Sequence, residues 1–356
     1  MRYSRRAQIR GIDFSMALII FMLVMSQILI MTSDLIQTNY DKARTFQQGT
    51  RISDYSESVV SSEGFPTSWG TTLTAALPAT WKFGLKTPGS NSLDPTKIGR
   101  LSDTTNSSYR LSYSDVKQGL NSSIGDKTFE IKLGYTFQVN ITSTTPTGSN
   151  IDVAGVVSKN GQGLNYSTVW VFGVNLAGVV STSTISATDG TFSATLMYAP
   201  LPSYSRIVVI ARYGAVTESM DTTTFVNTVT PTVANVTLQE RNTLSSGSML
   251  DMHVAGSSAD YDYHALFIPP VTSTTASTSD LITGGTSSSL NIPEKGIIVI
   301  VVVSQTLDEV GVTAFPTSVD MQPTNVPSDT SNSYTTTVLC RGILITFEFT
   351  VWENAA

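Results

Sequence analysis

The stretch that decides the architecture is FSMALIIFMLVMSQILIMT, residues 14–32, which contains no charged side chain. Its 19 residues come close to the length of about 20 that a helix needs to cross the hydrocarbon core of a bilayer. The apolar region of a secretory signal has only about 7 to 15 residues. The polar members Ser15, Ser26 and Gln27 do not form the broad hydrophilic face of a core helix in a globular domain. The sequence therefore predicts a transmembrane helix, with membrane lipid as its partner.

The charges on either side of this stretch predict its orientation. Four arginines lie among residues 1–10, whereas Asp34 and Asp41 offset Lys42 and Arg44 on the other side. Because an excess of Lys and Arg stays in the cytoplasm, the N-terminus is expected inside and everything after residue 33 outside. The predicted localisation is a single-pass protein of the cell membrane with an extracellular head.

The helix is expected to continue beyond the membrane as a stalk. No proline occurs in residues 33–62, and apolar residues such as Tyr55 and Val59 recur at steps of three and four. This period is that of a helix with one apolar face. Gly64 and Pro66 are the signals that end it.

Residues 64–142 are expected to form a membrane-proximal α+β packing layer, because they combine aromatic residues with turn formers. Asp94 can cap a short helix whose first position is Pro95. Ser112 and Asp115 have the spacing of a capping box before a second short helix.

The basic residues before Arg10, the Arg10-Gly11 pair and the apolar helix that follows resemble the class III signal of archaeal type IV pilin-like proteins. The resemblance covers roughly the first 60 residues. It implies that a prepilin peptidase cuts between Gly11 and Ile12, and that the helix packs in a filament core or remains in the membrane. Met16 stands where many pilins carry a glutamate. Asp13 is therefore the candidate assembly residue, which would pair with the Ile12 amine of a neighbouring subunit.

Residues 143–230 contain the clearest β pattern, in which IDVAGVV, STVWVFGV and RIVVIARY are bounded by turn formers. This pattern predicts an antiparallel sandwich. The spacings Gly155-x-Val157 and Asp189-Gly190-x-Phe192 resemble those of Ig-like or transthyretin-like modules, which implies a structural spacer. The residues expected to share its core are Val156, Val169, Val171, Phe192, Val208 and Ile210.

Residues 231–356 are expected to form a further, C-terminal β domain. Its run IIVIVVV, residues 297–303, is too short to span a bilayer as a helix and is typical of a strand buried on both faces. Cys340, the single cysteine, is expected to be a buried strand residue. No internal repeat is visible in the sequence.

The predicted fold class is thus a long N-terminal α-helix, transmembrane plus stalk, followed by a mainly β head of two or three domains that include an Ig-like β-sandwich. The predicted domains are a basic cytoplasmic leader (1–11), the transmembrane and stalk helix (12–63), the α+β layer (64–142), the Ig-like sandwich (143–230) and the C-terminal β domain (231–356).

Composition excludes a nucleic-acid partner and is compatible with a glycan coat. Charged residues make up 13% of the chain and the net charge is −6, whereas phosphate binding needs clustered Lys and Arg. Sugar would supply the hydration that charge does not supply here. The candidate glycosylation sites are Asn106, Asn121, Asn140, Asn165 and Asn235.

One group of residues has the chemistry of a metal site. Asp260, Asp262 and His264 would project from one face of a strand, and carboxylate with imidazole suits a divalent metal ion. The alternative is an exposed polar strand face. No catalytic elbow, phosphate-binding loop or zinc-protease motif occurs, so no enzyme activity and no cofactor are expected.

The function predicted from these observations is that of a pilin-like surface protein for structure or adhesion. It would be anchored or polymerised through its N-terminal helix, with copies of itself or other pilin-like subunits as partners. One alternative is an uncleaved, monomeric membrane-anchored module that contacts an S-layer or a secretion system. A remote alternative is a metal-dependent extracellular enzyme.

Overall fold

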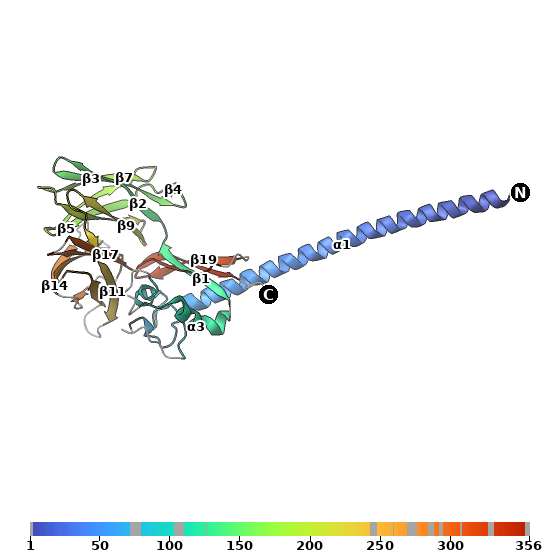
Figure 1. The fold of residues 1–356 in the computed structure, drawn as a ribbon, viewed down its shortest axis with the longest axis horizontal. Coiled ribbons are helices and arrows are strands. Elements are labelled where there is room, and N and C mark those ends of the chain that lie inside the picture. Colours follow the sequence, from blue (N-terminus) through green and yellow to red (C-terminus); the bar gives the residue numbers. More distant parts are fainter. Residues whose placement is uncertain are drawn as a thin grey trace. The chain divides into compact units, whose positions relative to one another are not determined.

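The first element is a single long helix, α1 (Tyr3–Ser61), as the sequence predicts. It ends before Gly64, whose positive φ of 70° suits a residue without a Cβ. The helix is followed by a mainly β head (Figure 1). The computed structural model describes residues 3–71, 80–102, 110–125, 127–242, 248–258, 260–268, 276–283, 288–291, 295–306, 308–326 and 331–352, with some helix and strand residues described by backbone alone.

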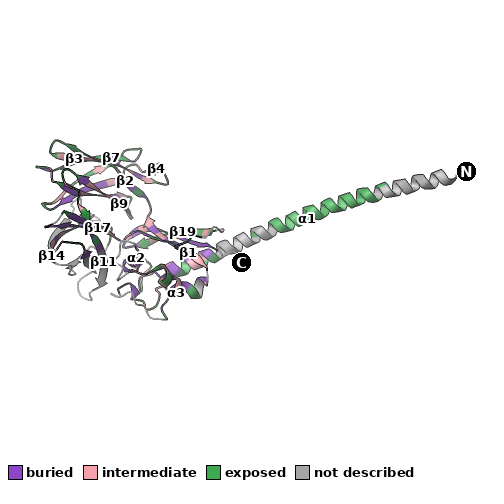
Figure 2. Ribbon diagram, in the orientation of Figure 1, coloured by how far each residue is buried: buried purple, intermediate pink, exposed green. Residues whose placement is uncertain are grey.

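The apolar part of α1 that the structure describes is Leu18–Thr38, which has 21 residues and a mean hydropathy of 2.1. None of it is buried by the protein. Figure 2 shows this part of the helix as exposed, in contrast to the buried residues of the strands. The length and composition are sufficient for a helix that crosses a membrane.

Two short helices confirm the predicted caps. Asp94 caps α2 (Pro95–Gly99) by accepting a hydrogen bond from the Thr96 amide, 3.0 Å away. Ser112 and Asp115 form the capping box of α3 (Tyr113–Ile124). These caps satisfy amide groups that the first turn of a helix leaves without a partner.

These helices belong to an α+β module, whose sheet joins segments from both ends of the head. In the sheet order β18-β1-β20-β19, neighbouring strands are antiparallel. Phe129 and Ile131 lie opposite Val351 and Phe349 in the register, and all four are buried. The module consists of the end of α1, η1 (Trp69–Thr71), α2, α3, β1 (Thr128–Tyr135), β18 (Val319–Met321), β19 (Ser331–Cys340) and β20 (Ile343–Trp352).

The core of the α+β module contains an aromatic cluster and a buried lysine. The rings of Trp69, Trp81 and Phe83 are 5.7 to 6.1 Å apart. The Lys97 ammonium donates hydrogen bonds to the carbonyl oxygens of Glu63 and Lys86, at 2.8 and 2.7 Å. Burial lowers the pKa of Lys97, and the carboxylate of Asp94 opposes this shift. These rings and Lys97 thus form a packed core in this part of the chain. The module does not coincide with the predicted layer, residues 64–142, because residues 138–142 belong to another sheet and β18, β19 and β20 come from the end of the chain.

The first sandwich consists of β2 (Gln138–Thr147), β3 (Asn150–Lys159), β4 (Gln162–Gly163), β5 (Thr168–Asn175), β6 (Gly178–Ile185), β7 (Thr191–Met197), β8 (Tyr204–Tyr213) and β9 (Thr217–Val226). Strands β2, β4 and β7 pair with β3 in one sheet, and the other sheet has the order β6-β5-β8-β9. Two facing antiparallel sheets of this kind are typical of Ig-like domains. The sandwich begins at Gln138 rather than at residue 143.

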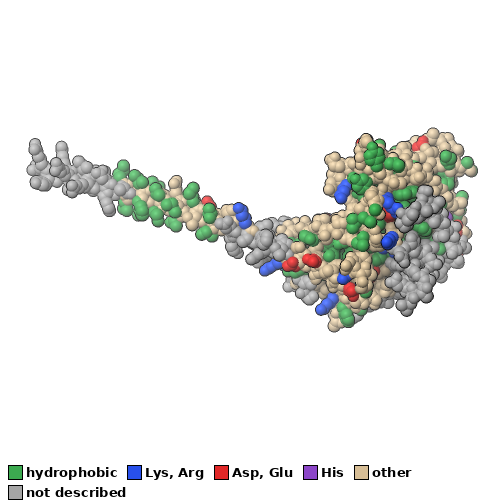
Figure 3. Space-filling view, turned by 180° about the vertical axis from the view of Figure 1, so that it is seen from behind, with side chains coloured by type: hydrophobic (Ala, Val, Ile, Leu, Met, Phe, Trp, Pro, Cys, Tyr) green, Lys and Arg blue, Asp and Glu red, His purple; other side chains and the backbone are tan. Residues whose placement is uncertain are grey.

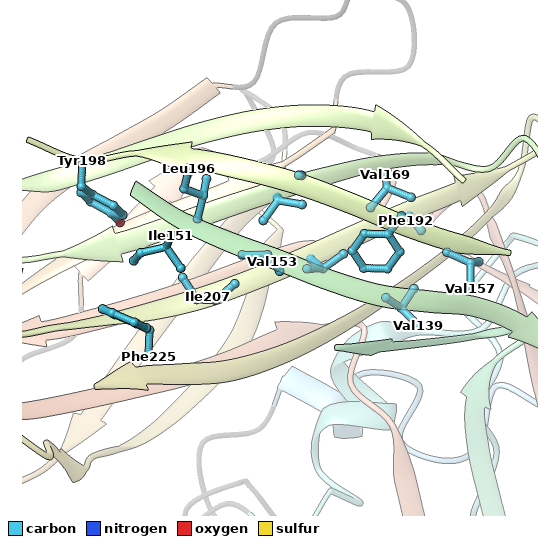
Figure 4. Close-up of a cluster of buried hydrophobic side chains, with 14 of the residues drawn as sticks. Val139, Ile151, Val153, Val157, Val169, Phe192, Leu196, Tyr198, Ile207 and Phe225 are labelled. Carbon is cyan, nitrogen blue, oxygen red and sulfur yellow. The ribbon is translucent and has the colours of Figure 1, made fainter. Parts of the chain in front are cut away.

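The core of the first sandwich lies between these sheets (Figure 4). Val169, Val171 and Phe192 belong to it, as predicted. The other three predicted residues were wrong, because Val156 is only half-buried and Val208 and Ile210, although buried, are not among the core residues. A shift of one residue along a strand moves a side chain to the opposite face. The core positions on these strands are Ile151, Val153, Val157, Ile207, Val209 and Ala211.

The second sandwich consists of β10 (Thr232–Val233), β11 (Asn235–Asn242), β12 (Ser248–Ala255), β13 (Asp260–Phe267), β14 (Ala276–Thr283), β15 (Ser288–Asn291), β16 (Ile298–Ser304) and β17 (Glu309–Phe315). Its sheets have the orders β11-β12-β15 and β10-β17-β16-β13-β14. Every residue of β16 is buried, which confirms the prediction for the apolar run.

The two sandwiches share one strand order, although no repeat is visible in the sequence. Without the two-residue strands β4 and β10, each sandwich has seven strands. The first, second and fifth of them form one sheet, which is β2, β3 and β7 in the first sandwich and β11, β12 and β15 in the second. The remaining four form the other sheet in both sandwiches. The head therefore contains two tandem Ig-like units.

The two sandwiches are inserted into the α+β module. Strand β1 leads into the first sandwich and β18 follows the second, and Leu133 of β1 lies opposite Val319 of β18. Tyr135 is the last residue of β1, and Pro316 lies just before β18. The Tyr135 hydroxyl donates a hydrogen bond to the Pro316 carbonyl oxygen, 3.0 Å away. Strand pairing thus divides the expected C-terminal domain, residues 231–356, between the second sandwich and the α+β module.

Candidate binding site between the two sandwiches

Each sandwich has a second apolar face that its own core does not explain. On β5, β8, β13 and β16, the apolar residues that alternate with the core positions are also buried, as is His264. In the first sandwich these outer-face residues are Trp170, Phe172, Val174, Val208 and Ile210, and in the second they are His264, Leu266, Val299, Val301 and Val303.

At one end of these faces, an ion pair of the first sandwich binds the second. Arg212 of β8 lies opposite Glu218 of β9, and its Nε donates a hydrogen bond to Oε1 of Glu218 at 2.9 Å. The other carboxylate oxygen accepts a hydrogen bond from the amide of Ile297, which precedes β16, at 2.8 Å. The Arg212 guanidinium also lies over the Trp170 ring, 5.7 Å from its centroid. We refer to Arg212, Glu218 and Ile297 as the latch.

At the other end of the same faces, residues of both sandwiches line a cavity of about 430 Å³ that is open to solvent. Its walls come from the β5–β6 turn, the loop before β8 and the loop after β16. The residues that line it are Asn175, Leu176, Ala177, Pro202, Ser203, Tyr204, Ser304, Gln305, Thr306 and Asp308.

The latch and the cavity together place the two outer faces against each other. Arg212 lies opposite Thr168 at the start of β5, and Asn175 is the last residue of that strand. Ile297 precedes β16, and Ser304 is its last residue. Because contacts join the sandwiches at both ends of β5 and β16, we infer that the buried faces between these ends cover one another.

The α+β module also contacts both sandwiches. The Leu344 amide of β20 donates a hydrogen bond to the Val216 carbonyl in the β8–β9 turn, at 2.8 Å. The Gly296 amide donates to the Arg341 carbonyl in the β19–β20 turn, at 2.9 Å. The sandwiches are thus fixed by hydrogen bonds as well as by the two chain connections.

Fixed hydrogen bonds orient two amide side chains of the cavity. The Asn175 Oδ1 atom accepts a hydrogen bond from the Ala177 amide, so its NH₂ group remains as a donor for a ligand. The Gln305 NH₂ group donates to both carboxylate oxygens of Asp262 at 3.1 Å, so its Oε1 atom remains as an acceptor. The cavity therefore offers both kinds of hydrogen-bonding group in set directions.

The structure places the predicted metal residues on β13 but gives each a different environment. Asp260 and Asp262 are half-buried, and His264 is buried in the face between the sandwiches. Burial lowers the pKa of His264, and the charge of Asp262 opposes this shift. Among the described residues, no three His, Cys, Asp or Glu side chains are grouped so that they could hold a metal ion. Nothing in this geometry supports the metal hypothesis or the enzyme alternative that depends on it.

The remaining predicted site residues have no shared location. Asn121, Asn140, Asn165 and Asn235 are exposed, as a glycosylated asparagine must be, and their modification stays a prediction. Asn106 lies outside the described residues. The backbone of Gly11, Ile12 and Asp13 is part of α1, and their side chains lie outside the described ones. Cys340 is buried at the end of β19, as predicted.

The cavity was not predicted, because its walls come from loops separated by up to about 130 residues. The signal that could have indicated the interface is the continuous apolar character of residues 169–174 and 297–303. A strand with both faces apolar needs two apolar neighbours, and a single sandwich core provides only one.

Comparisons with known proteins place the chain in no established family. No family model matches it, and no curated protein matches it. Among solved structures it is similar to a 1.5-MDa bacterial ice-binding adhesin, at 15% identity over 56% of this chain and 69% of that chain, with a TM-score of 0.21. It is similar to tandem repeats from the extending region of a large adhesion protein, at 16% identity over 53% and 50%, with a TM-score of 0.23.

A third similarity is to a segment of two fibronectin type III domains from chicken tenascin. It has 13% identity and covers 54% of this chain and 99% of that chain, with a TM-score of 0.18. TM-scores this low carry no argument about function. The class of protein is therefore defined by the chain's own structure, as one long helix that contains an apolar span, followed by an α+β module with two inserted Ig-like sandwiches.

Proposed function

We propose that this chain is a pilin-like surface protein that is anchored through α1 and presents its paired sandwiches outward for adhesion or envelope contact. The observation that carries the proposal is the apolar span Leu18–Thr38, which none of the protein buries. Figure 3 shows that hydrophobic side chains cover the described part of this span. Such a surface needs lipid or other apolar helices around it.

Two further features support the pilin-like form of the proposal. The helix continues without a break from this span to Ser61, and the module that follows contains a four-stranded antiparallel sheet. The basic leader and the Gly11-Ile12 bond resemble a prepilin peptidase signal. The alternative is an uncleaved monomeric anchor. N-terminal sequencing of the mature protein separates the two, because cleavage gives a chain that starts at Ile12 and a plain anchor retains residues 1–11.

We expect Leu23→Arg to prevent stable membrane insertion. Leu23 is exposed near the middle of the apolar span, and a central arginine costs about 2.5 to 3.5 kcal/mol on insertion scales. Carbonate extraction measures the effect as protein released from the membrane fraction. Val326→Arg, at an exposed position of the head, is the control and should stay in the membrane fraction. Equal extraction of the Leu23→Arg and wild-type proteins would contradict the anchor.

We expect Asp13→Asn to reduce assembly if the chain forms filaments. The substitution keeps the size of the side chain but removes the charge that would pair with a neighbour's terminal amine in an apolar core. Electron microscopy of surface filaments and sequencing of the mature N-terminus measure assembly and processing separately. Normal filaments from a correctly processed Asp13→Asn protein would show that this carboxylate has no part in assembly.

A further inference from the structure

The cavity between the sandwiches has the size and composition of a ligand site. Its volume of about 430 Å³ lies within the range of about 300 to 1,000 Å³ that is usual for small-molecule sites. Both sandwiches contribute to its walls, with Asn175 and Ser203 from the first and Gln305 and Asp308 from the second. Sites of this kind are frequent at the interface of two domains.

We propose that this cavity binds a neutral saccharide unit through Asn175, Gln305 and Asp308, with Leu176 against the apolar face of the sugar ring. The inference deepens the proposed adhesive function and rests on it, because only an outward-facing head would meet a saccharide outside the cell. It assigns the recognition step to the junction of the two sandwiches.

The hydrogen-bonding groups suit sugar hydroxyls. Each hydroxyl is both a donor and an acceptor, so a binding site needs groups of both kinds. Asn175 can donate through its NH₂ group, whereas Gln305 and Asp308 can accept. The Ala177 amide and the Asp262 carboxylate fix the orientations of the two amide side chains before a ligand binds, which lowers the entropy cost of binding.

The charge of the cavity selects against anions. The described residues that line it include no Lys, Arg or His, and Asp308 contributes a negative charge. Burial raises the pKa of Tyr204, and the nearby Asp308 carboxylate raises it further. A phosphate or an acidic sugar would meet repulsion here with no compensating cation. A neutral polyhydroxyl ligand meets no such penalty.

One wall of the cavity is apolar. Leu176, Ala177, Pro202 and Tyr204 provide it, and the side chain of Leu176 is 51% exposed in the β5–β6 turn. Sugar rings carry C–H groups on their faces, which gain from contact with apolar surface. A combination of such a wall with directed polar groups is the usual composition of a ligand pocket.

The test is saturation-transfer NMR on the full-length protein in lauryldimethylamine oxide micelles, because a detergent with a sugar headgroup would compete. The probes are D-glucose, D-galactose, D-mannose and N-acetyl-D-glucosamine, with N-acetylneuraminate as the anionic comparison. We expect transfer to the ring protons of at least one neutral sugar. Asp308→Ala should weaken its binding by about tenfold or more, since hydrogen bonds to charged groups are the stronger ones.

Matched variants control for changes in fold. Asp320→Ala removes an exposed carboxylate on β18, outside the cavity, and should bind like wild type. Leu176→Ala should weaken binding, whereas Leu339→Ala, at a half-exposed leucine of β19, should not. Because this experiment requires no membrane anchoring and no filament, its result is independent of the extraction and assembly experiments above.

Three results would overturn the proposal. The first is the absence of transfer to all four neutral sugars, and the second is equal binding by the wild-type and Asp308→Ala proteins. The third is stronger binding of N-acetylneuraminate, or sugar binding only after Ca²⁺ is added, which would identify an anion or a cation site instead.

Discussion

Phe192→Ala is expected to destabilise the first sandwich by about 3–5 kcal/mol, which is the usual cost of removing a buried aromatic ring. Phe192 of β7 is only 5% exposed and lies opposite Gly155 of β3 in the register. A Cβ atom built on Gly155 would lie 2.5 Å from the ring, so the ring occupies the space above this glycine. After the substitution, neither the alanine methyl group nor Gly155 can fill the space that the Phe192 ring occupied.

The measurement is thermal and urea unfolding of the full-length protein, followed by circular dichroism. Phe65→Ala is the control, because Phe65 is 54% exposed in the α+β module. The control is expected to change the free energy of unfolding by less than about 0.5 kcal/mol. If both variants unfold like the wild type, Phe192 does not belong to the core of the first sandwich.

Arg212→Met is expected to cost about 3–5 kcal/mol, because it leaves the Glu218 carboxylate buried without its cation. Glu218 is 3% exposed, and of its latch partners only the Ile297 amide would remain. The loss should weaken the attachment of the second sandwich to the first as well as the sheet that contains β8 and β9. Urea unfolding is expected to shift to lower denaturant concentration, and hydrogen exchange at the start of β16 should become faster.

A second substitution tests whether the buried charge is the cause. Arg212→Met combined with Glu218→Gln should recover part of the lost stability, because a neutral amide is less costly to bury than a carboxylate. Lys159→Met is the control, because Lys159 is an exposed lysine at the end of β3 in the same sandwich. This substitution also replaces a cation by methionine, but at the surface, where the change in the free energy of unfolding is usually within about 0.5 kcal/mol. Equal losses for Arg212→Met and Lys159→Met would refute the importance of the latch.

The sequence determined those features that depend on neighbouring residues. The apolar run from residue 14, the absence of proline and the Gly64 and Pro66 signals predicted a helix that the structure shows to end at Ser61. Asp94 and Ser112 cap their helices as predicted, because a cap joins atoms only two or three residues apart. The β character of the head and the burial of β16 were also predicted from periodicity and turn residues.

Only the tertiary structure decided how these segments combine. The pairing of β1 with β20, more than 200 residues later, makes the two sandwiches an insertion rather than a linear series of domains. The apolar runs of β5 and β16 predict burial of both faces, but they do not say which surface covers the second face. Asn175, Ser203, Gln305 and Asp308 share a cavity only because these two faces meet. Local patterns specify which face of a strand is apolar, whereas the partner of that face depends on the packing of the whole head.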